Sequence, residues 1–352
     1  MSRAVVLVSP RNIALQEVEV PAPGPRQIRV RTLFSGISHG TEMAWYRGTA
    51  PGWTKHLVDG LYAEGPEPRT EHPLCLGYEE VAEVVEVGSE VTEVAVGDRI
   101  TSAYGHREEA VLNVEGNDYL FTLPPETEPE RFIFLALGGV ALDSYLTSRV
   151  RLGESAVVFG LGVIGLLLVQ MLKLGGVKPV LGVEPLARRR ELAWELGADE
   201  VLDPAETEVG RTVRQLLGET QGADVVFETS GNYAALQEAI RCGAPGYSKL
   251  VATAFYQGPA EALRLGEEFH HGGSLRQGGC TQIVINDHRL PPAFGRAWDR
   301  RRILRTVFHW LASGALRVEP LLTHRFPFPE APAAFRLIDE HPEETIKVVL
   351  HP

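Results

Sequence analysis

Residues 157–165 read VVFGLGVIG, an apolar run that passes into three glycines at GxGxxG spacing. In such a turn the first glycine allows a tight reversal, the second lets a pyrophosphate approach the backbone, and the third lets a helix pack against the strand. The free N–H groups and the positive dipole end of that helix favour phosphate. The apolar strand pattern before the turn and the apolar helix pattern after it predict dinucleotide binding. The residues expected at the cofactor are Gly160, Gly162, Val163, Ile164 and Gly165.

Glu184 ends the next strand pattern, about 20 residues beyond the glycines, where a carboxylate can bind the hydroxyls of a ribose. The same carboxylate repels a 2′-phosphate, which favours NAD over NADP. Arg189, within three consecutive arginines, is able to pair with that phosphate instead, so NADP stays open as the cofactor. Thr229 and Ser230, at the end of a later strand pattern, are further expected cofactor contacts.

Strand and helix patterns alternate around the glycine turn, from SAVVFG at residues 155–160 to CTQIVI at residues 280–285. Alternation at this spacing predicts a parallel sheet with helices on both faces. The chain before the turn is different: short strand patterns such as QIRVRTLF (27–34), separated by Pro and Gly, predict a compact β-rich domain with antiparallel pairing. Residues 49–72 are rich in Pro and Gly and read as an irregular loop, which we interpret as an ordered lid.

The composition narrows the classes of protein and of partner. A chain of 352 residues is too long for a single core, so two domains are expected. The net charge of −12 and the absence of a long basic run argue against nucleic acid and anionic membrane surfaces as partners. No stretch approaches the roughly 18 consecutive apolar residues of a membrane span, and no signal-peptide pattern is present. The 3 cysteines are widely spaced and odd in number, which indicates reduced thiols and a cytoplasmic location.

Three longer stretches carry a family resemblance: LGYEEVAEVVEVGSEVTEVAVGDRI (76–100), VEPLARRRELAWELGADEVLD (183–203) and LLTHRFPFPEAPAAFRLID (321–339). With the glycine turn, they resemble the medium-chain dehydrogenase/reductase superfamily, the alcohol dehydrogenase-like enzymes, over nearly the whole chain. The resemblance implies an α/β protein with two domains, a GroES-like β-rich catalytic domain and a Rossmann dinucleotide-binding domain. The catalytic domain would comprise residues 1–124 and 286–352, with the Rossmann domain at residues 125–285 between them. The active site would lie in the cleft between the domains.

The stretch SGISHGTE (35–42) and the triplet GYE (77–79) match positions where zinc-containing members of that superfamily carry two of their zinc ligands. Those members have a Cys in a GICGTD-like motif and a His in a GHE motif. Here Ser38 or His39 stands at the position of the Cys, depending on which end of the motif is aligned. Tyr78 stands at the position of the His.

A catalytic zinc needs three protein ligands and one open position. His39 and Glu79 offer two at most, and Ala136 stands near the third position, so we expect no metal ligands and no zinc. SGISHGTE, GYE and the stretch GEEFHHGGSLRQGG (266–279) resemble a zinc-lacking branch that includes bacteriochlorophyllide a dehydrogenase.

Without zinc, the resemblance points to other groups for the proton chemistry. Thr41 stands where zinc relatives have a proton-relay hydroxyl, and His39 is able to exchange that proton with solvent near neutral pH. Tyr78 is able to donate a hydrogen bond to a developing alkoxide, or it simply fills the space left by the metal. Glu42 and Glu79 are expected to hold arginines or backbone amides that shape the site. The catalytic candidates are therefore Thr41, His39, Tyr78 and Glu79.

The leading hypothesis is an NAD(P)-dependent dehydrogenase that moves hydride between nicotinamide and a secondary alcohol or ketone. An enoyl or quinone reductase of the same superfamily is the second, and a non-catalytic cofactor-binding protein the third. The expected partners are a small-molecule substrate and a second copy of the chain in a homodimer. His270 and His271 are consecutive, so their side chains diverge, and solvent or substrate contacts are expected rather than a shared metal.

Overall fold

The computed structural model describes residues 2–53, 55–59, 61–64, 73–218, 221–256, 260–264, 282–285 and 298–352. The chain forms two compact units: unit 1 is Met1–Ala136 with Phe308–Pro352, and unit 2 is Leu137–Val307. Unit 2 is thus inserted in the sequence of unit 1. The expectations for residues 266–279, with His270 and His271, and for residues 65–72 of the proposed lid lie outside the described residues.

Unit 2 is organised around a parallel sheet with the order β13-β12-β11-β14-β15-β16 among the described residues. Its strands are β11 (Ala156–Phe159), β12 (Val180–Val183), β13 (Glu200–Leu202), β14 (Val225–Glu228), β15 (Lys249–Ala252) and β16 (Gln282–Ile285). Every residue of β11, β12 and β14 is buried, as expected of parallel strands covered on both faces. The strand order reverses beside β11, with β12 on one side and β14 on the other, and such sheets bind ligands at the carboxyl ends of the strands there.

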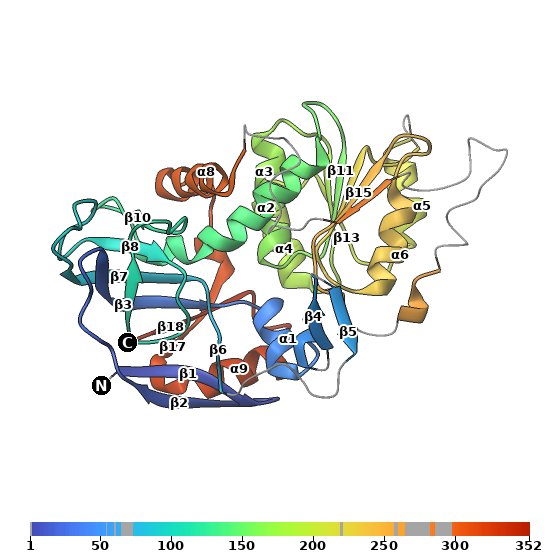
Figure 1. Ribbon diagram of the computed structural model, residues 1–352. Coiled ribbons are helices and arrows are strands. Elements are labelled where there is room, and N and C mark those ends of the chain that lie inside the picture. The colour runs from blue at the N-terminus through green and yellow to red at the C-terminus, as the bar shows by residue number, and fades with distance from the viewer. Residues whose placement is uncertain are drawn as a thin grey trace. The chain divides into compact units, whose positions relative to one another are not determined.

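The helices of unit 2 are α2 (Leu135–Ser148), which begins at the boundary, α3 (Val163–Leu174), α4 (Ala187–Glu195), α5 (Val209–Leu216), α6 (Tyr233–Cys242) and the 3-10 turn η3 (Ala260–Ala262). Helices α3 and α4 lie on one face of the sheet, and α5 and α6 lie on the other (Figure 1). The side chain of Asn232 caps α6, because its Oδ1 accepts a hydrogen bond from the Ala234 backbone N–H at 2.8 Å. Both faces of the sheet are therefore covered, as the alternating pattern predicts.

Unit 1 is mostly antiparallel sheet. Its largest sheet has the order β10-β8-β7-β3-β18-β17, with β9 also paired to β3; β2-β1-β6 and β4-β5 form two smaller sheets. The strands are β1 (Ser2–Ser9), β2 (Asn12–Val18), β3 (Gln27–Ile37), β4 (Lys55–Val58), β5 (Leu61–Glu64), β6 (Leu74–Cys75), β7 (Glu80–Val87), β8 (Arg99–Ser102), β9 (Glu109–Asn113), β10 (Phe121–Thr122), β17 (Leu322–Pro327) and β18 (Lys347–His351). The central strand is β3, which pairs with β7, β9 and the C-terminal strand β18. The end of the chain is therefore part of the N-terminal sheet.

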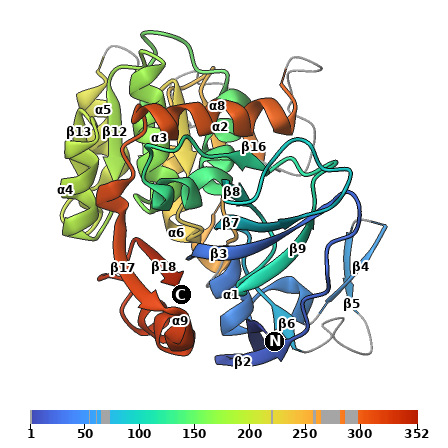
Figure 2. The same cartoon turned by 90° about the vertical axis from the view of Figure 1, so that its left-hand side faces the viewer.

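Two helices pack beside these strands. They are α1 (Thr41–Arg47) and α9 (Ala331–Glu340), which share a core with β3 and β18 that includes Met43, Phe335 and Leu350. Figure 2 shows α9 together with β17 and β18 as the red C-terminal part of this unit. The 3-10 turns are η1 (Pro51–Trp53), η2 (Pro129–Phe134), η5 (Glu319–Leu321) and η6 (Phe328–Glu330).

Helix α8 (Arg300–Ser313) crosses the boundary between the units in sequence. On its unit 1 side, the ring of Phe308 lies 5.0 Å from the ring of Phe121, stacked on it, and 5.0 Å from that of Phe132. These aromatic contacts join the second segment of unit 1 to the first.

The expected α/β class is confirmed, with a parallel sheet in unit 2 and a β-rich unit 1. The units divide at residues 136–137 and 307–308. The sequence patterns change earlier, near residues 124–125 and 285–286. Among the described helices, none has the length and apolar character needed to span a membrane.

Candidate active site

The glycine turn of unit 2 has the shape that a pyrophosphate requires. Gly160 has φ of +81°, and a Cβ there would lie 2.7 Å from the backbone nitrogen of Ser230. A Cβ on Gly165 would lie 2.0 Å from the carbonyl oxygen of Gly160, so only glycine lets α3 start this close to β11. Gly162 caps α3, and a Cβ added to it would meet no atom within 4 Å. Space is therefore open at the glycine that the motif assigns to the phosphates.

Glu184, directly after β12, is buried and linked to this turn. Its Oε2 accepts a hydrogen bond from the Leu161 backbone N–H at 2.8 Å, and its Oε1 accepts one from Leu186 at 3.2 Å. The Arg189 guanidinium lies 3.9 Å from Glu184 Oε2, and burial lowers the pKa of Arg189 despite that carboxylate. Arg190 has a structural role, because it forms an ion pair with Asp203 at 2.8 Å. Glu184, whose carboxylate favours NAD, and Arg189, whose charge favours NADP, thus lie side by side.

Thr229 and Ser230 hold the segment after β14 against the glycine turn. The Thr229 hydroxyl lies within hydrogen-bond distance of two backbone oxygens, Phe159 O at 3.0 Å and Gly160 O at 2.7 Å. The Ser230 backbone N–H and hydroxyl both donate to Glu228, whose pKa is raised by burial and lowered in part by this hydroxyl. Sequence reasoning missed Glu228, although a carboxylate inside an apolar strand pattern is a recognisable signal. Contacts of Thr229 and Ser230 with a cofactor stay a prediction.

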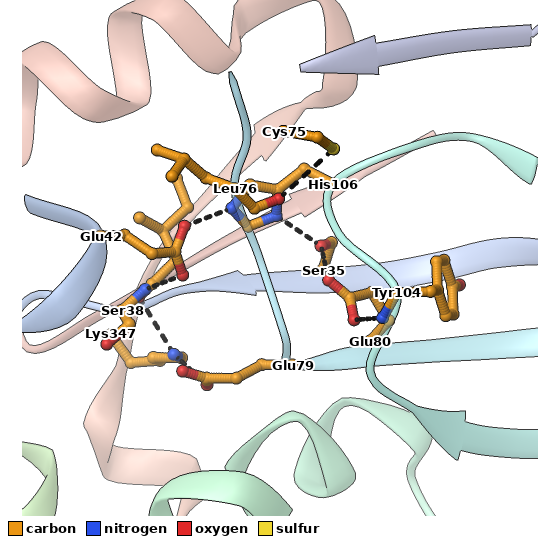
Figure 3. Close-up of polar contacts among 11 residues, drawn as sticks. Ser35, Ser38, Glu42, Cys75, Leu76, Glu79, Glu80, Tyr104, His106 and Lys347 are labelled. Atoms are coloured by element: carbon orange, nitrogen blue, oxygen red, sulfur yellow. Dashed lines mark hydrogen bonds and ion pairs between the residues drawn. The ribbon is translucent and has the colours of Figure 1, made fainter. Parts of the chain in front are cut away.

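A second polar cluster lies in unit 1, around the stretch 35–42 (Figure 3). Glu42, in the first turn of α1, is only 1% exposed. Its Oε1 accepts a hydrogen bond from the Ser38 backbone N–H at 2.9 Å, and its Oε2 lies 2.6 Å from His106 Nε2. Glu42 therefore holds a backbone amide, as expected, but its other partner is a histidine rather than an arginine.

His106 is fully buried and joins three elements. Its Nδ1 lies 2.7 Å from the Ser35 hydroxyl on β3, and that hydroxyl donates to Glu80 Oε1 on β7 at 3.2 Å. Burial lowers the pKa of His106, but the carboxylates of Glu42, Glu80 and Glu79 together outweigh burial and hold the pKa above its ordinary value. Gly77 makes room for the ring: its φ is +108°, and a Cβ there would lie 2.8 Å from His106 Nδ1. Sequence reasoning missed His106.

Tyr78 lies beside the hydroxyls of the stretch 35–42. The side chains of Ser38 and Thr41 lie close enough to its phenol to lower the pKa of Tyr78 slightly. Burial raises that pKa far more, helped by the charges of Glu79 and Glu42, and the net result is well above the ordinary value. Tyr78 therefore stays a neutral phenol and is able to donate a hydrogen bond. The structure brings Thr41 and Tyr78 together as expected, whereas His39 is half-buried in the turn before α1.

Glu79 faces a lysine that sequence reasoning also missed. Lys347 on β18 forms an ion pair with Glu79 Oε2 and donates a hydrogen bond to the Ile37 carbonyl oxygen at 3.0 Å. The other carboxylate oxygen, Oε1, is buried and has no hydrogen-bond partner among the described residues. Burial raises the pKa of Glu79 to about 7, although Lys347 lowers it. Gly36 leaves the space for this pair, since a Cβ there would lie 2.8 Å from Lys347 Cε.

Comparison with known proteins bears on both clusters. The family described as "Alcohol dehydrogenase GroES-like domain" matches residues 24–128, and that described as "Zinc-binding dehydrogenase" matches residues 163–281. D-guloside 3-dehydrogenase of Escherichia coli (strain K12) is 32% identical over 98% of this chain and 99% of its own. L-threonine 3-dehydrogenase of Pyrococcus horikoshii is 27% identical over 92% of this chain and 91% of its own. The crystal structure of 2R,3R-butanediol dehydrogenase from Bacillus subtilis has the same fold, with a TM-score of 0.77 at 22% identity over 100% of both chains.

These matches correct the expectation that zinc is absent. That expectation rested on Ser38 and Tyr78 at two ligand positions, whereas residues 163–281 match a family of zinc-binding dehydrogenases, so zinc is to be expected and a zinc-lacking branch is not supported. The side chains around Tyr78 do not form a ready ligand set. Within the described part of the chain, the one group of three possible ligands with donor atoms within 4.8 Å of one another is the exposed trio His341, Glu343 and Glu344.

Proposed function

Because the chain belongs to the medium-chain, zinc-type alcohol dehydrogenase superfamily and is a dehydrogenase, we propose that it oxidises a secondary hydroxyl of a sugar derivative or polyol. The reverse reaction would reduce the corresponding ketone. NAD(P), when bound, supplies the hydride acceptor or donor for either direction. The oxidation releases one proton from the hydroxyl, and the residues of unit 1 would receive it.

The observation that carries this proposal is the hydroxyl cluster of Tyr78, Ser38 and Thr41. A phenol with a strongly raised pKa keeps its proton at neutral pH, so it is a donor to oxygen rather than a base. Such a donor stabilises the negative charge that develops on a substrate oxygen as hydride moves. Tyr78 would therefore orient the oxygen of the alcohol or ketone.

The proton itself would pass through Thr41. Its hydroxyl is able to accept a proton from one side while it gives its own away on the other. His39, two residues earlier in the turn, would exchange that proton with solvent, because an imidazole changes charge near neutral pH. Glu79 would act on the electrostatics of Tyr78 rather than on the substrate, since its charge raises the Tyr78 pKa.

The cofactor would lie on the glycine turn of unit 2, with NAD preferred. The N–H groups at the start of α3 would hold the pyrophosphate above Gly162. Glu184 would hold the ribose hydroxyls and disfavour a 2′-phosphate, while Arg189 is the residue that keeps NADP open.

The substrate class rests on the named relatives. The relative that is 32% identical along nearly its whole length is named for oxidation of a guloside at position 3, which is a secondary alcohol on a sugar ring. The enoyl or quinone reductase hypothesis has no specific observation in its favour. The non-catalytic hypothesis is not retained, since the chain is a dehydrogenase.

The test is turnover with a panel of glycosides, free sugars, polyols and simple secondary alcohols, each with NAD+ or NADP+, and of enones and quinones with NAD(P)H, in buffer that contains zinc. Formation of reduced cofactor with one of the sugar or polyol substrates supports the proposal. Turnover confined to enones or quinones with NAD(P)H, or to none of the alcohols, contradicts it. Homodimer formation and a cytoplasmic location also stay predictions, to be checked by sedimentation of the purified protein and by cell fractionation.

A further inference from the structure

A chain of buried polar groups runs through unit 1 from α1 to β7. Its members are Glu42, His106, Ser35 and Glu80, of which none is more than 1% exposed. They come from α1, the segment before β9, β3 and β7, and the sheet pairing brings them together (Figure 3). At its other end this series of polar groups reaches the backbone of Tyr104, whose N–H donates to Glu80 Oε2 at 2.9 Å.

The hydrogen-bond contacts restrict where the protons of these four polar groups lie. The Ser35 hydroxyl has a single hydrogen, and it donates that hydrogen to Glu80 Oε1. His106 Nδ1, at 2.7 Å from the same hydroxyl, must then be the donor in their contact. His106 Nε2 faces a carboxylate oxygen of Glu42 at 2.6 Å and must donate as well. In this arrangement both ring nitrogens carry hydrogen, and the ring is an imidazolium between two carboxylates.

A second arrangement of the same protons leaves the total charge unchanged. If the Ser35 hydroxyl turns to donate to His106 Nδ1, the proton of that nitrogen must have moved to Glu80, which then donates to Ser35. In both arrangements His106 Nε2 keeps its hydrogen and donates it to Glu42. The contact between His106 and Glu42 is thus preserved whichever way Ser35 turns.

The groups around the ring leave no other acceptor for Nε2 among the described residues in contact with it. Glu79, next to Glu80, adds a further negative charge near the ring, and the rings of His106 and Phe335 of α9 form a T-shaped pair with 6.0 Å between centroids. Glu42 in turn holds the Ser38 backbone with its second oxygen at 2.9 Å. His106 is therefore linked through Glu42 to the backbone that carries the Ser38 and Thr41 hydroxyls.

We propose that His106 is a positioning residue for the dehydrogenase reaction, which holds Glu42 so that the Ser38 and Thr41 hydroxyls face Tyr78. This inference rests on the proposed function, because the hydroxyls are those assigned to the proton. A buried ionic network of this kind adds little net stability compared with apolar packing, so stability alone does not account for it. Displacement of reacting groups by about 1 Å, in contrast, costs on the order of 100-fold in rate.

The kinetic test compares His106→Gln and His106→Leu in the full-length enzyme. Gln keeps one donor toward Glu42 and should lower kcat modestly, whereas Leu removes it and should lower kcat by about 10- to 100-fold. The KM for NAD(P)H should stay within about twofold of the parent, because the dinucleotide turn belongs to unit 2. His309→Gln, an exposed histidine of unit 1 outside the group of possible metal ligands, is the matched control and should behave as the parent.

A spectroscopic test does not depend on turnover. In protein with 15N-labelled histidine, the His106 ring, assigned by its loss in His106→Gln, should show Nε2 protonated at neutral pH, as both arrangements require. The Ser38 amide signal should shift in His106→Leu and return toward the parent position in His106→Gln.

The outcomes separate the two proposals. If the parent oxidises no alcohol of the panel, the proposed function fails, and the ring and amide signals alone judge the His106–Glu42–Ser38 linkage. If the parent is active and His106→Leu, folded by circular dichroism, keeps the parental kcat, the positioning role is wrong. A Ser38 amide signal that is the same in His106→Leu as in the parent would overturn the linkage as well.

Discussion

Lys347 and Glu79 form an ion pair in which neither side chain is exposed to solvent. They lie far apart in sequence and meet because β18 pairs with β3, which in turn pairs with β7. Oε2 of Glu79 accepts from Lys347, whereas Oε1 has no hydrogen-bond partner among the described residues. A buried pair of this kind is costly to break, because removal of one ion leaves the other without compensation.

Replacement of Lys347 by Met should therefore destabilise the protein. At about pH 8, above the Glu79 pKa of about 7, the uncompensated carboxylate is expected to lower the free energy of unfolding by about 3–5 kcal/mol, measured by urea denaturation. The double variant Lys347→Met, Glu79→Gln should recover at least half of that loss, since the buried charge is gone. Arg26→Met, at an ion pair with both side chains more than half exposed, is the control and should cost less than about 1 kcal/mol. A Lys347→Met variant as stable as this control would contradict the assignment.

The raised pKa of Glu79 predicts how stability depends on pH. A carboxyl that takes up its proton near pH 7 in the folded state, against 4.5 when unfolded, binds more protons folded than unfolded between these values. Its contribution is therefore complete below pH 4.5 and is lost as pH rises through about 7. The total loss should be no more than about 3.5 kcal/mol. Melting temperatures across this range should fall more steeply for the parent than for Glu79→Gln, and parallel curves would refute the shift.

Part of the site could be predicted because its signals are local. The glycines from Gly160 to Gly165 act within one turn, and their spacing alone indicates both the strand before them and the helix after them. The parallel sheet of unit 2 follows from its continuous apolar strands in the same way. Such features need no knowledge of distant residues.

The missed residues depend on pairing over long distances. His106 reaches Glu42 and Ser35 only after β3 and β7 have paired, and Lys347 reaches Glu79 only after β18 joins β3. No spacing rule connects these positions. A retrospective signal exists for Lys347, a charged residue directly before the apolar run VVL of β18 that must find a buried partner. The prediction about zinc failed for another reason: it treated two substituted ligand positions as decisive, whereas the family match argues for zinc.

Cofactor preference can be tested in unit 2. NADH should raise the melting temperature more than NADPH, because the Glu184 carboxylate repels a 2′-phosphate. Glu184→Ser should narrow or reverse this preference, and it should also weaken NADH binding, since Glu184 holds the Leu161 N–H of the glycine turn. Arg189→Ser should weaken the binding of NADPH but not of NADH. The loss should be about 1.5–3 kcal/mol if Arg189 makes a charge-assisted hydrogen bond to the 2′-phosphate.

Arg188→Ser is the matched control for Arg189, because Arg188 is exposed and lies directly before Arg189 in α4. It should leave both melting shifts unchanged. Equal protection by NADH and NADPH in the parent would mean that Arg189 outweighs Glu184.

The hydroxyls of unit 1 give the sharpest test of the proposed chemistry. Tyr78→Phe removes the phenolic donor and Thr41→Val removes the proton-carrying hydroxyl, each with almost no change in volume. Each should lower kcat by roughly 10²–10⁴-fold, the usual contribution of a general acid–base group. Both should leave the NADH melting shift unchanged, because Glu184 and the glycine turn lie in unit 2. His39→Gln should move the pH–rate profile rather than abolish turnover, as expected of a group that exchanges the proton with solvent.

Tyr247→Phe is the control for loss of a phenol, since Tyr247 is 57% exposed and belongs to unit 2. The pH dependence separates two explanations for a slow Tyr78→Phe variant. Because the Tyr78 pKa lies well above its ordinary value, the parent rate should show no ionisation of this phenol near neutral pH. A rate in Tyr78→Phe that recovers as pH rises would indicate that Tyr78 supplies the proton as well as the hydrogen bond. If all three variants match the parent at every pH, the stretch 35–42 is a structural turn, and the proton leaves by another route.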